Sequence, residues 1–376
     1  MKVDARAEAW ARLQVTGLAP RPMVDLLRAF GTPEGVLSAK PAQRRTVVAA
    51  PAARLLAEGP DPQRLETTLA WLAQPGNALV AWGDDDYPHA LLEIADPPPV
   101  FYCIGRRDLL SKPALAIVGS RNATPQGSAD AEAFAAALSA AGLTIVSGLA
   151  LGIDAAAHRG GLRGAGSSIA VVGTGPDRVY PAANRALAHE LAERGLILSE
   201  FTPGTPPLPH NFPRRNRVVS GLARGILVVE ATISSGSLIT ARLAGEQGRE
   251  VFALPGSIHS PFSKGCHKLL REGAKLVETA QDVLEELKFA RASPARAAAS
   301  SDPRASTADD ELTDEEKSVV AALGYAPAGV DAIAQRTALA AETIAAALLS
   351  LELAGRVAPL PGGLWQRLSE AGEAEG

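Results

Sequence analysis

Short apolar runs recur through the middle of this sequence at intervals of 25 to 29 residues. An interval of this length holds one strand, one loop and one helix. Such alternation predicts a parallel sheet with helices on both faces and right-handed crossovers, which is a doubly wound α/β fold. The runs begin near Ala114, Leu143, Ser168, Leu196, Gly225, Glu250 and Lys275.

The first of these runs, Ala114–Val118, is uniformly apolar and stops at a glycine. A run without alternation is typical of a parallel strand that is covered on both faces. Open α/β sheets bind their ligands at the carboxyl ends of the strands. Gly119, Ser120 and Arg121 are therefore expected at the edge of the sheet where binding takes place.

Composition narrows the class of protein. A chain of 376 residues is expected to form two or three domains, and a hydrophobic share of 47% suffices for a large core. The formal net charge of −4 argues against a globally basic nucleic-acid binder but leaves local basic patches open. Two distant cysteines, Cys103 and Cys266, are expected to be reduced thiols in a cytoplasmic protein. No window approaches the ~18 apolar residues of a membrane span, so no membrane partner is expected.

The pattern changes along the chain and predicts four parts. Residues 1–75 show short helical patterns broken by Gly and Pro and predict a helical domain of helix-hairpin-helix type. Residues 76–289 hold the alternating strands and helices. Residues 290–310 are rich in Ala, Ser and Pro and predict a flexible linker. Residues 311–370 predict a second small domain. Two further strand-like runs open the central part, at Ala78–Trp82 and Val100–Ile104.

The predicted helical domain contains one turn of possible functional interest, Val15–Arg21. It resembles the hairpin of a helix-hairpin-helix, in which two glycines free backbone N–H groups to hold a phosphate. Ala19 stands where the second glycine would be. Two interpretations stay open, a phosphate-binding hairpin and a helical cap that packs on the rest of the chain.

The C-terminal part has the pattern of a winged helix. Thr313 and Glu316 form a capping box at the start of the first helix. Two more helices are expected near Asp331–Arg336 and Glu342–Leu353, followed by a β-hairpin over residues 356–367. A winged helix that reads DNA usually carries Arg, Lys or Asn on its third helix. Residues 338–355 contain no Lys or Arg, which favours docking to protein.

The common enzyme and cofactor motifs are missing from the sequence. There is no G-x-x-x-x-G-K-[ST], no G-x-S-x-G and no H-E-x-x-H. A Gly-Thr-Gly triplet ends at Gly175, but Pro176 and Asp177 replace the helix start that a dinucleotide needs. The six histidines show no ligand spacing. We therefore expect no cofactor, no metal and no catalytic residue.

Three loops that follow predicted strands have the composition of anion sites. They are residues 119–127, residues 147–154 and residues 234–240, and each is rich in Gly and Ser. Small residues at a helix start expose backbone N–H groups and the positive end of the helix dipole. Three such loops at one edge of one sheet predict an anion-binding surface that includes Ser235, Gly236 and Ser237.

The most informative segment runs from Phe201 to Val229 and contains no acidic residue. Backbone-tracking grooves for single-stranded nucleic acid combine arginines with aromatic rings on which bases stack. Phe212 lies within five residues of three of the arginines, so the segment predicts binding of single-stranded nucleic acid. The arginines in this window are Arg214, Arg215, Arg217 and Arg224.

At this point the motifs resemble those of the DNA-processing protein A family (DprA, or Smf). The resemblance spans about residues 100–287. Its motifs are Ile117–Arg121, Val146–His158, Tyr180–Asn184, Phe212–Arg217, Ser235–Ala241 and two segments at residues 265–267 and 273–276. The N-terminal helical part and the winged-helix tail also look like extensions found in that family.

The resemblance implies an extended Rossmann-like domain that binds single-stranded DNA without a cofactor. It also implies a role in natural transformation, in which the protein protects incoming DNA and helps to load the RecA recombinase. By motif position, the DNA contacts are Gly119, Ser120, Arg121, Phe212, Arg214, Arg215, Asn216 and Arg217. The resemblance further implies a homodimer that uses His267, Leu270 and Leu276.

One departure from the family pattern concerns the Tyr180–Asn184 stretch. Some members carry a basic residue there, whereas this chain has Ala182 and Ala183. Arg178 and Arg185 flank the gap, and Arg178 is the candidate that replaces the missing contact.

Two other functions stay open. Related Rossmann-like folds bind nucleotides and hydrolyse the base–ribose bond, so a phosphoribohydrolase acting on nucleoside monophosphates is an alternative. That reaction needs a carboxylate at the strand ends, for which Glu200, Glu230 and Asp154 are the candidates. A third interpretation is a protein-docking scaffold with a vestigial DNA site.

Overall fold

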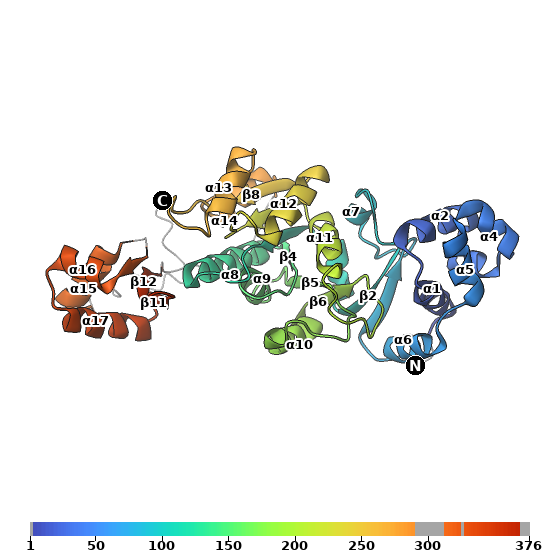
Figure 1. The fold of residues 1–376 in the computed structure, drawn as a ribbon, viewed down its shortest axis with the longest axis horizontal. Helices are drawn as coiled ribbons and strands as arrows, with labels where there is room; N and C mark the ends of the chain where they lie inside the picture. Colours follow the sequence, from blue (N-terminus) through green and yellow to red (C-terminus); the bar gives the residue numbers. More distant parts are fainter. Residues whose placement is uncertain (1–2, 290–311, 325–326, 369–376) are drawn as a thin grey trace, which may run out of the picture.

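The computed structural model describes residues 3–289, 312–324 and 327–368. The predicted linker, residues 290–310, lies outside the described residues. Along the described chain, a group of helices comes first, a large sheet with helices on both faces follows, and a small helical unit with its own sheet comes last (Figure 1).

The N-terminal part is helical, as predicted. Three of its helices, α3, α4 and α6, each begin at a proline, which suits the first helical position because its missing N–H is not needed there. The helices are α1 (Ala5–Val15), α2 (Pro20–Phe30), α3 (Pro33–Ser38), α4 (Pro41–Val47), α5 (Ala50–Glu58) and α6 (Pro62–Leu72).

A nine-stranded sheet forms the centre of the molecule, in the order β1-β2-β6-β5-β4-β3-β7-β8-β9. From β6 to β9 all neighbours in this order are parallel, and the expected strand starts are confirmed. The first two strands differ, because β1 pairs antiparallel with β2 and β2 pairs antiparallel with β6. The strands are β1 (Asn77–Ala81), β2 (Val100–Gly105), β3 (Ala114–Val118), β4 (Thr144–Ser147), β5 (Ser168–Val172), β6 (Leu196–Ser199), β7 (Gly225–Val228), β8 (Glu250–Ala253) and β9 (Lys275–Leu276).

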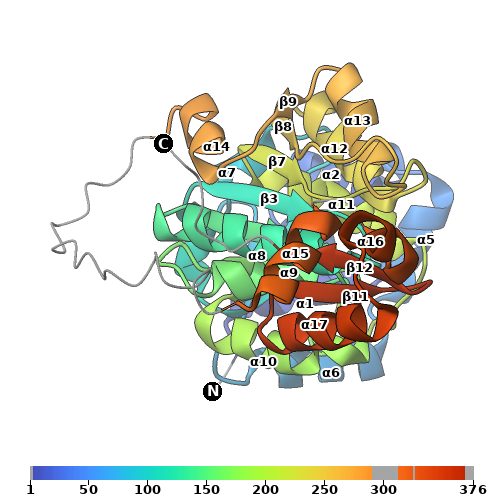
Figure 2. The ribbon, with the colours of Figure 1, turned by 90° about the vertical axis from the view of Figure 1, so that its left-hand side faces the viewer.

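Helices cover both faces of this sheet, as the alternating pattern predicts (Figures 1 and 2). On one face, α11, α12 and α13 bury side chains such as Val218, Ala244 and Leu269 in one apolar core. On the other face, α8, α9 and α14 form a second core with side chains such as Leu138 and Ile153. The helices of this part are α7 (His89–Leu92), α8 (Pro125–Ala140), α9 (Ile153–Gly161), α10 (Arg185–Arg194), α11 (Asn211–Leu222), α12 (Gly236–Glu246), α13 (Lys264–Arg271) and α14 (Ala280–Glu286).

The N-terminal helices pack on the antiparallel end of the sheet. Their core, which contains Trp10 and Leu13, also takes in Ala81 of β1 and Val100 of β2. Trp71 of α6 lies edge-on to Tyr102 of β2, with ring centroids 5.7 Å apart. The hairpin of β1 and β2 therefore belongs to the sheet by its hydrogen bonds and to the helical part by its packing.

The C-terminal part is the expected winged helix, and the predicted capping box between Thr313 and Glu316 is present. A two-residue strand, β10, was not predicted and completes a three-stranded sheet in the order β10-β12-β11. The elements are α15 (Asp314–Leu323), β10 (Ala328–Gly329), α16 (Val330–Thr337), α17 (Ala341–Leu353), β11 (Val357–Leu360) and β12 (Leu364–Arg367).

In the parts of the chain that the structure describes, no single helix has the length and apolar character needed to cross a membrane. One pair of helices, α16 and α17, meets the criterion together, but the pair is bent by 111°.

Candidate nucleic-acid interface

The three loops predicted as anion sites converge on one open groove of about 680 Å³. They follow β3, β4 and β7, which are neighbours in the sheet. Their carboxyl ends therefore meet at one edge, and α11 forms a further wall. The predicted site residues that line the groove are Gly119, Ser120, Arg121, Phe212, Arg215, Asn216, Ser235, Gly236 and Ser237.

The loop after β3 is held from below by Glu230, which follows β7. The backbone N–H of Ser120 donates to the carbonyl oxygen of Glu230 at 2.7 Å. A Cβ atom on Gly119 would lie 2.8 Å from the same oxygen, so only glycine fits there. Further along, Thr124 donates from its hydroxyl to Glu230 Oε1 at 2.6 Å. The loop is fixed from its buried side, and Arg121 at its tip is exposed.

The loop after β4 depends on a buried histidine. His158 Nε2 accepts the backbone N–H of Leu149 at 3.2 Å, and Leu149 has a positive φ of 59°. His158 Nδ1 lies 2.7 Å from Ser168 Oγ. Because Ser168 donates its own hydroxyl to the carbonyl of Ile145, Nδ1 must carry the proton. The imidazole is therefore neutral, and burial lowers the pKa of His158 to about 3.

Asp154 closes the same loop from the start of α9. Its Oδ2 accepts the backbone N–H groups of Gly148 at 3.1 Å and Ala150 at 3.3 Å. Burial raises the pKa of Asp154, against the opposing effect of the Arg215 charge and of these hydrogen bonds. The two N–H groups are occupied by Asp154 and are not free for an anion.

The three arginines of α11 divide into one half-exposed and two buried side chains. Arg214 is half-exposed; it donates to Glu200 Oε1 at 2.8 Å and lies over the ring of Phe201 at 5.3 Å. Arg217 is buried and donates to the same carboxylate oxygen at 2.5 Å and to the carbonyl of Asp96. Neither Arg214 nor Arg217 lines the groove.

Arg215 is buried as well, although part of it reaches the groove wall. Its Nη1 donates to the carbonyl of Gly148 at 2.5 Å and to that of Val171. Burial lowers the pKa of Arg215 to about 10, and the nearby Asp154 charge opposes this shift.

The assignment of Arg215 and Arg217 as phosphate contacts stays a prediction, and the structure shows both side chains in internal hydrogen bonds. Arg215 donates through Nη1, and Arg217 donates through Nη1 and Nη2, to acceptors inside the protein, so both side chains help to hold the loops in place. The sequence carried a sign of this for Arg215. Asn211, Arg215, Val218 and Leu222 recur at helical spacing and form the buried stripe of α11.

Arg224 completes the arginine window of the sequence but lies elsewhere. It precedes β7, and its backbone N–H donates to the carbonyl of Ala114 at the start of β3. It is therefore exposed at the amino ends of the strands, away from the groove.

Phe212 stands at the rim with one side covered and one side in the groove. A Cβ atom on Gly173 would lie 2.9 Å from its ring, so the ring packs directly on that backbone. Tyr180 lies beside it, with ring centroids 5.6 Å apart and planes inclined by 43°. The Arg121 guanidinium carbon lies 6.0 Å from the Phe212 centroid. Arg121, Phe212 and Tyr180 thus form one cluster, called here the rim cluster.

The loop after β7 caps α12. Ser235 accepts the backbone N–H of Ser237 at 3.3 Å, and the two hydroxyl groups lie 2.6 Å apart. Gly236 is exposed at the first position of the helix. The loop therefore presents a helix N-terminus to the groove, the geometry that favours a negative charge.

Arg178 lies outside the groove lining. It is exposed on the loop after β5, and its backbone N–H donates to the carbonyl of Gly175 at 3.0 Å. Its assignment as a replacement contact stays a prediction. Tyr180, Thr232 and Phe262 also line the groove, although none of them was predicted as a contact and Tyr180 was noted only as the first residue of a motif. For Tyr180 a signal was available, because a tyrosine ends the loop after a buried strand in a chain with only 4% aromatic residues.

The residues predicted for dimer contacts lie at the β9 end of the sheet. His267 is half-buried and has Nε2 3.0 Å from the carbonyl of Gly256. Leu270 is partly buried against the core, whereas Leu276 is 53% exposed on β9.

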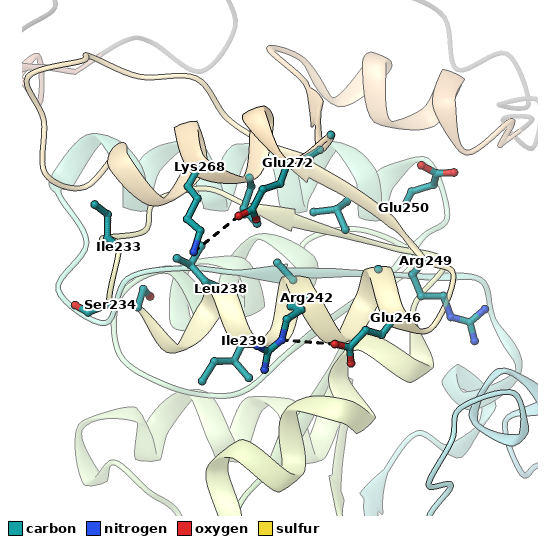
Figure 3. Close-up of a pocket in the computed structure, with 17 residues that line it drawn as sticks. Ile233, Ser234, Leu238, Ile239, Arg242, Glu246, Arg249, Glu250, Lys268 and Glu272 are labelled. Atoms are coloured by element: carbon teal, nitrogen blue, oxygen red, sulfur yellow. Dashed lines mark ion pairs between the residues drawn. The ribbon is translucent and has the colours of Figure 1, made fainter.

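A second groove of about 960 Å³ lies near these residues, between α12 and α13. Its apolar floor includes Leu238, and its rim carries charges of both signs (Figure 3). The rim charges pair within each helix, Arg242 with Glu246 at 3.6 Å and Lys268 with Glu272 at 3.9 Å.

The three carboxylates named for the hydrolase alternative all have internal partners. Glu200 binds Arg214 and Arg217, Glu230 binds Thr124, and Asp154 binds backbone N–H groups. Of the three, only Asp154 lines the groove. Among the residues described, no group of His, Cys, Asp or Glu is arranged to hold a metal ion.

The fold and the groove define a Rossmann-like α/β protein whose strand-end loops, without a nucleotide-binding fingerprint, surround an arginine and an aromatic pair. A family model described as DNA recombination-mediator protein A matches residues 78–288, and a DprA winged-helix model matches residues 303–363. The chain therefore belongs to the DNA recombination-mediator protein A family, and the resemblance seen in the sequence is confirmed.

Similar proteins agree with this assignment. Protein Smf of Escherichia coli is 42% identical over 300 residues, which cover 80% of each chain. The X-ray structure of DNA processing protein A from Streptococcus pneumoniae has a TM-score of 0.68 and 39% identity, covering 77% of this chain and all of that one. The structure of DNA processing protein A from Helicobacter pylori, which concerns its single-stranded DNA binding mode, has a TM-score of 0.52 and 32% identity. It covers 56% of this chain and 95% of that one.

Proposed function

We propose that this chain binds single-stranded DNA in the strand-end groove and acts in the cytoplasm as a recombination mediator of natural transformation. In this role it protects incoming strands and helps to load the RecA recombinase, without catalytic turnover. The observation that carries the proposal is the rim cluster, in which exposed Arg121 lies over Phe212 beside two Gly- and Ser-rich loops.

The parts of the groove suit the parts of a single strand. Arg121 and the N-terminus of α12 attract phosphates, and the faces of Phe212 and Tyr180 accept bases that are not paired. A stacking surface tolerates every base, so it explains binding without sequence preference. The net charge of −4 makes the attraction local to the groove. The family name and the single-stranded DNA binding of the Helicobacter pylori relative support this assignment.

Fluorescence anisotropy with labelled single- and double-stranded oligonucleotides, at several salt concentrations, tests the proposal. We expect Arg121→Glu to weaken single-strand binding severely while the protein stays folded. One lost phosphate contact should reduce the salt slope by about 0.7. Arg224→Glu is the matched control, because it makes the same charge change at the opposite ends of the strands. Equal effects of the two substitutions, or preferred binding of duplex, would contradict the proposal.

The hydrolase alternative predicts a product that is simple to detect. If the groove holds a nucleoside monophosphate for hydrolysis, incubation with AMP releases adenine. We expect no release, because the candidate carboxylates serve internal partners. If the wild type releases adenine and Asp154→Asn does not, the groove is the active site of a hydrolase and the DNA-binding proposal is wrong.

The role toward RecA is tested by the nucleation rate of RecA filaments on single-stranded DNA. We expect the wild-type protein to shorten the nucleation delay and Arg121→Glu to lose this effect together with DNA binding. A protein that binds DNA but leaves the delay unchanged would limit the function to strand protection.

We also propose a homodimer through the β9 end, where His267, Leu270 and exposed Leu276 lie. Two linked grooves gain affinity for one long strand through effective concentration. A Leu270→Glu, Leu276→Glu double variant should sediment as a folded monomer and bind long strands more weakly. A wild-type monomer at micromolar concentration would end this part of the proposal.

A further inference from the structure

We infer that Tyr180 is a second base-stacking residue of the groove, which holds a base next to the one on Phe212; this inference rests on the proposed function. Tyr180 is 50% exposed. Among the described residues it is the one aromatic side chain that counts as exposed, and it lines the groove. An aromatic ring in that position has a large apolar face in water, and a base is a ligand that covers such a face.

Contacts within the protein cover only part of the Tyr180 ring. Tyr180 touches Phe212 on one side, and in the described chain its hydroxyl group has no hydrogen-bond partner. Buried tyrosines usually place the hydroxyl on a partner. The hydroxyl of Tyr87, for example, donates to the carbonyl of Pro98 at 2.6 Å. The hydroxyl of Tyr102 also has no partner, but that ring is fully buried, so it is the 50% exposure of the ring that sets Tyr180 apart.

The geometry of the two rings determines how bases can be held. A base between two parallel rings needs about 7 Å between their planes, twice the stacking distance. The centroids of Tyr180 and Phe212 are only 5.6 Å apart and their planes are inclined by 43°. The two rings therefore cannot hold one base between them, and a base on Tyr180 must use the exposed face of that ring alone.

Two inclined stacking faces hold neighbouring bases in different planes. Bases held in this way are separated from each other, which a paired duplex does not allow but a single strand does. Arg121 lies beside the Phe212 ring, where it can neutralise a phosphate close to the stacked bases. The site thus takes a step of two unpaired nucleotides, and its preference for single strands follows from the geometry of the rings.

The experiment compares Tyr180→Ala, Tyr180→Leu and Tyr180→Phe in the full chain, with labelled oligo(dT) as the probe. We expect Tyr180→Ala to weaken binding about five- to a hundredfold, the range for one stacked base. Tyr180→Leu keeps an apolar side chain against Phe212 but should lose most of the affinity, whereas Tyr180→Phe should keep it. Leu208→Ala is the matched control, because Leu208 is a partly exposed apolar residue of a neighbouring loop outside the groove lining.

Two further measurements separate stacking from other roles. The salt slope should stay unchanged in Tyr180→Ala, since no phosphate contact is removed. A double variant that combines Tyr180→Ala with Phe212→Ala gives a second test. The losses of binding free energy in the two single variants should add in the double variant if the rings hold different bases, and should fall short of their sum if the rings share one base. An oligonucleotide with abasic sites should bind wild type and Tyr180→Ala equally.

The outcomes also separate this inference from the proposed function. If wild type binds single strands and Tyr180→Ala or Tyr180→Leu binds equally well, the role of Tyr180 is wrong while the groove stands. If wild type does not bind single strands at all, the proposed function fails first. A loss in Tyr180→Ala that persists on abasic DNA would overturn stacking and indicate distortion of Phe212.

Discussion

The strand-end groove and the winged helix place their charged and apolar side chains in opposite ways. Beneath the groove, Arg215, Arg217 and Glu200 are buried with one another or with backbone carbonyls. In the winged helix, Leu349 is 57% and Leu353 83% exposed on α17. In the groove region, buried charged side chains hold the polar loops in place. In the winged helix, apolar side chains are left exposed to water.

This difference indicates which ligand each region suits. A groove that must offer N–H groups and an arginine to a polyanion needs loops with fixed geometry, and buried ion pairs supply it. The helix α17 stands where DNA-reading winged helices carry basic residues, yet its exposed stripe is Ala345, Leu349 and Leu353. A stripe of this kind suits an apolar partner surface, not phosphates.

The largest expected effect comes from removing a buried charge. Arg215→Met leaves the carbonyls of Gly148 and Val171 without their donor and leaves Asp154 uncompensated. Leaving a buried polar group without its hydrogen-bond partner typically lowers the free energy of unfolding by about 1–3 kcal/mol per group. Thermal unfolding should show a clear drop in Tm, and Arg224→Met, at an exposed position, should show none. If Arg215→Met leaves Tm unchanged but abolishes DNA binding, Arg215 contacts a phosphate directly.

An intermediate effect is expected from acid. The folded-state pKa of His158 lies near 3, below the ordinary value of 6.5, so the unfolded chain binds the proton more readily. This contribution to stability is full above pH 6.5 and is lost between pH 6.5 and 3, by up to about 1.4 kcal/mol per pH unit. Protonated Nε2 could no longer accept the N–H of Leu149, so the groove loop should open.

The comparison with His158→Gln isolates this effect, since glutamine can accept the same N–H and does not titrate. Burial raises the pKa of Asp154, and that of Asp130 to about 6, so these carboxyls gain relative stability in acid and oppose the histidine. The wild type should therefore lose stability more steeply than His158→Gln between pH 6.5 and 3 in urea titrations. Parallel curves for the two proteins would show that His158 does not hold the loop through its neutral form.

The smallest expected effect is that of removing the winged helix. A chain ending after Phe289, which packs on the sheet core, should keep most of its affinity for single strands. In the full chain, Leu349→Glu with Leu353→Glu should leave both Tm and single-strand affinity nearly unchanged, because both side chains are exposed. If the truncated protein loses its affinity for single strands, the DNA site lies in the winged helix and not in the strand-end groove.

The sequence predicted those features that depend on local spacing. The uninterrupted apolar runs predicted the parallel strands. The convergence of the three loops was also predictable, because neighbouring parallel strands have their carboxyl ends at the same edge of the sheet. The direction of β1 and β2 was not predictable, because the short runs at Ala78–Trp82 and Val100–Ile104 carry no signal for their partner. The sheet partner, β6, lies about a hundred residues away, and its choice depends on long-range packing.

The arginines show the same limit at the level of single residues. Arg121, Arg214 and Arg224 look alike in the sequence, and only the fold shows that Arg121 lies at the groove rim and Arg224 at the opposite ends of the strands. The helical phase placed Arg215 on the buried stripe of α11, a prediction available from Val218 and Leu222. The burial of Arg217 depends on Glu200, which no local pattern joins to it.

The shortness of β9 has a consequence for how the molecule can grow into larger assemblies. The last strand of the large sheet has two residues, and one of them is Lys275, which pairs with Glu250 Oε2 at 3.0 Å. Sheets with short, lysine-bearing edges resist the addition of a strand from another chain. The homodimer proposed for this end would therefore form through side chains such as Leu276 and not by extending the sheet, and growth of the sheet from one copy into the next is disfavoured.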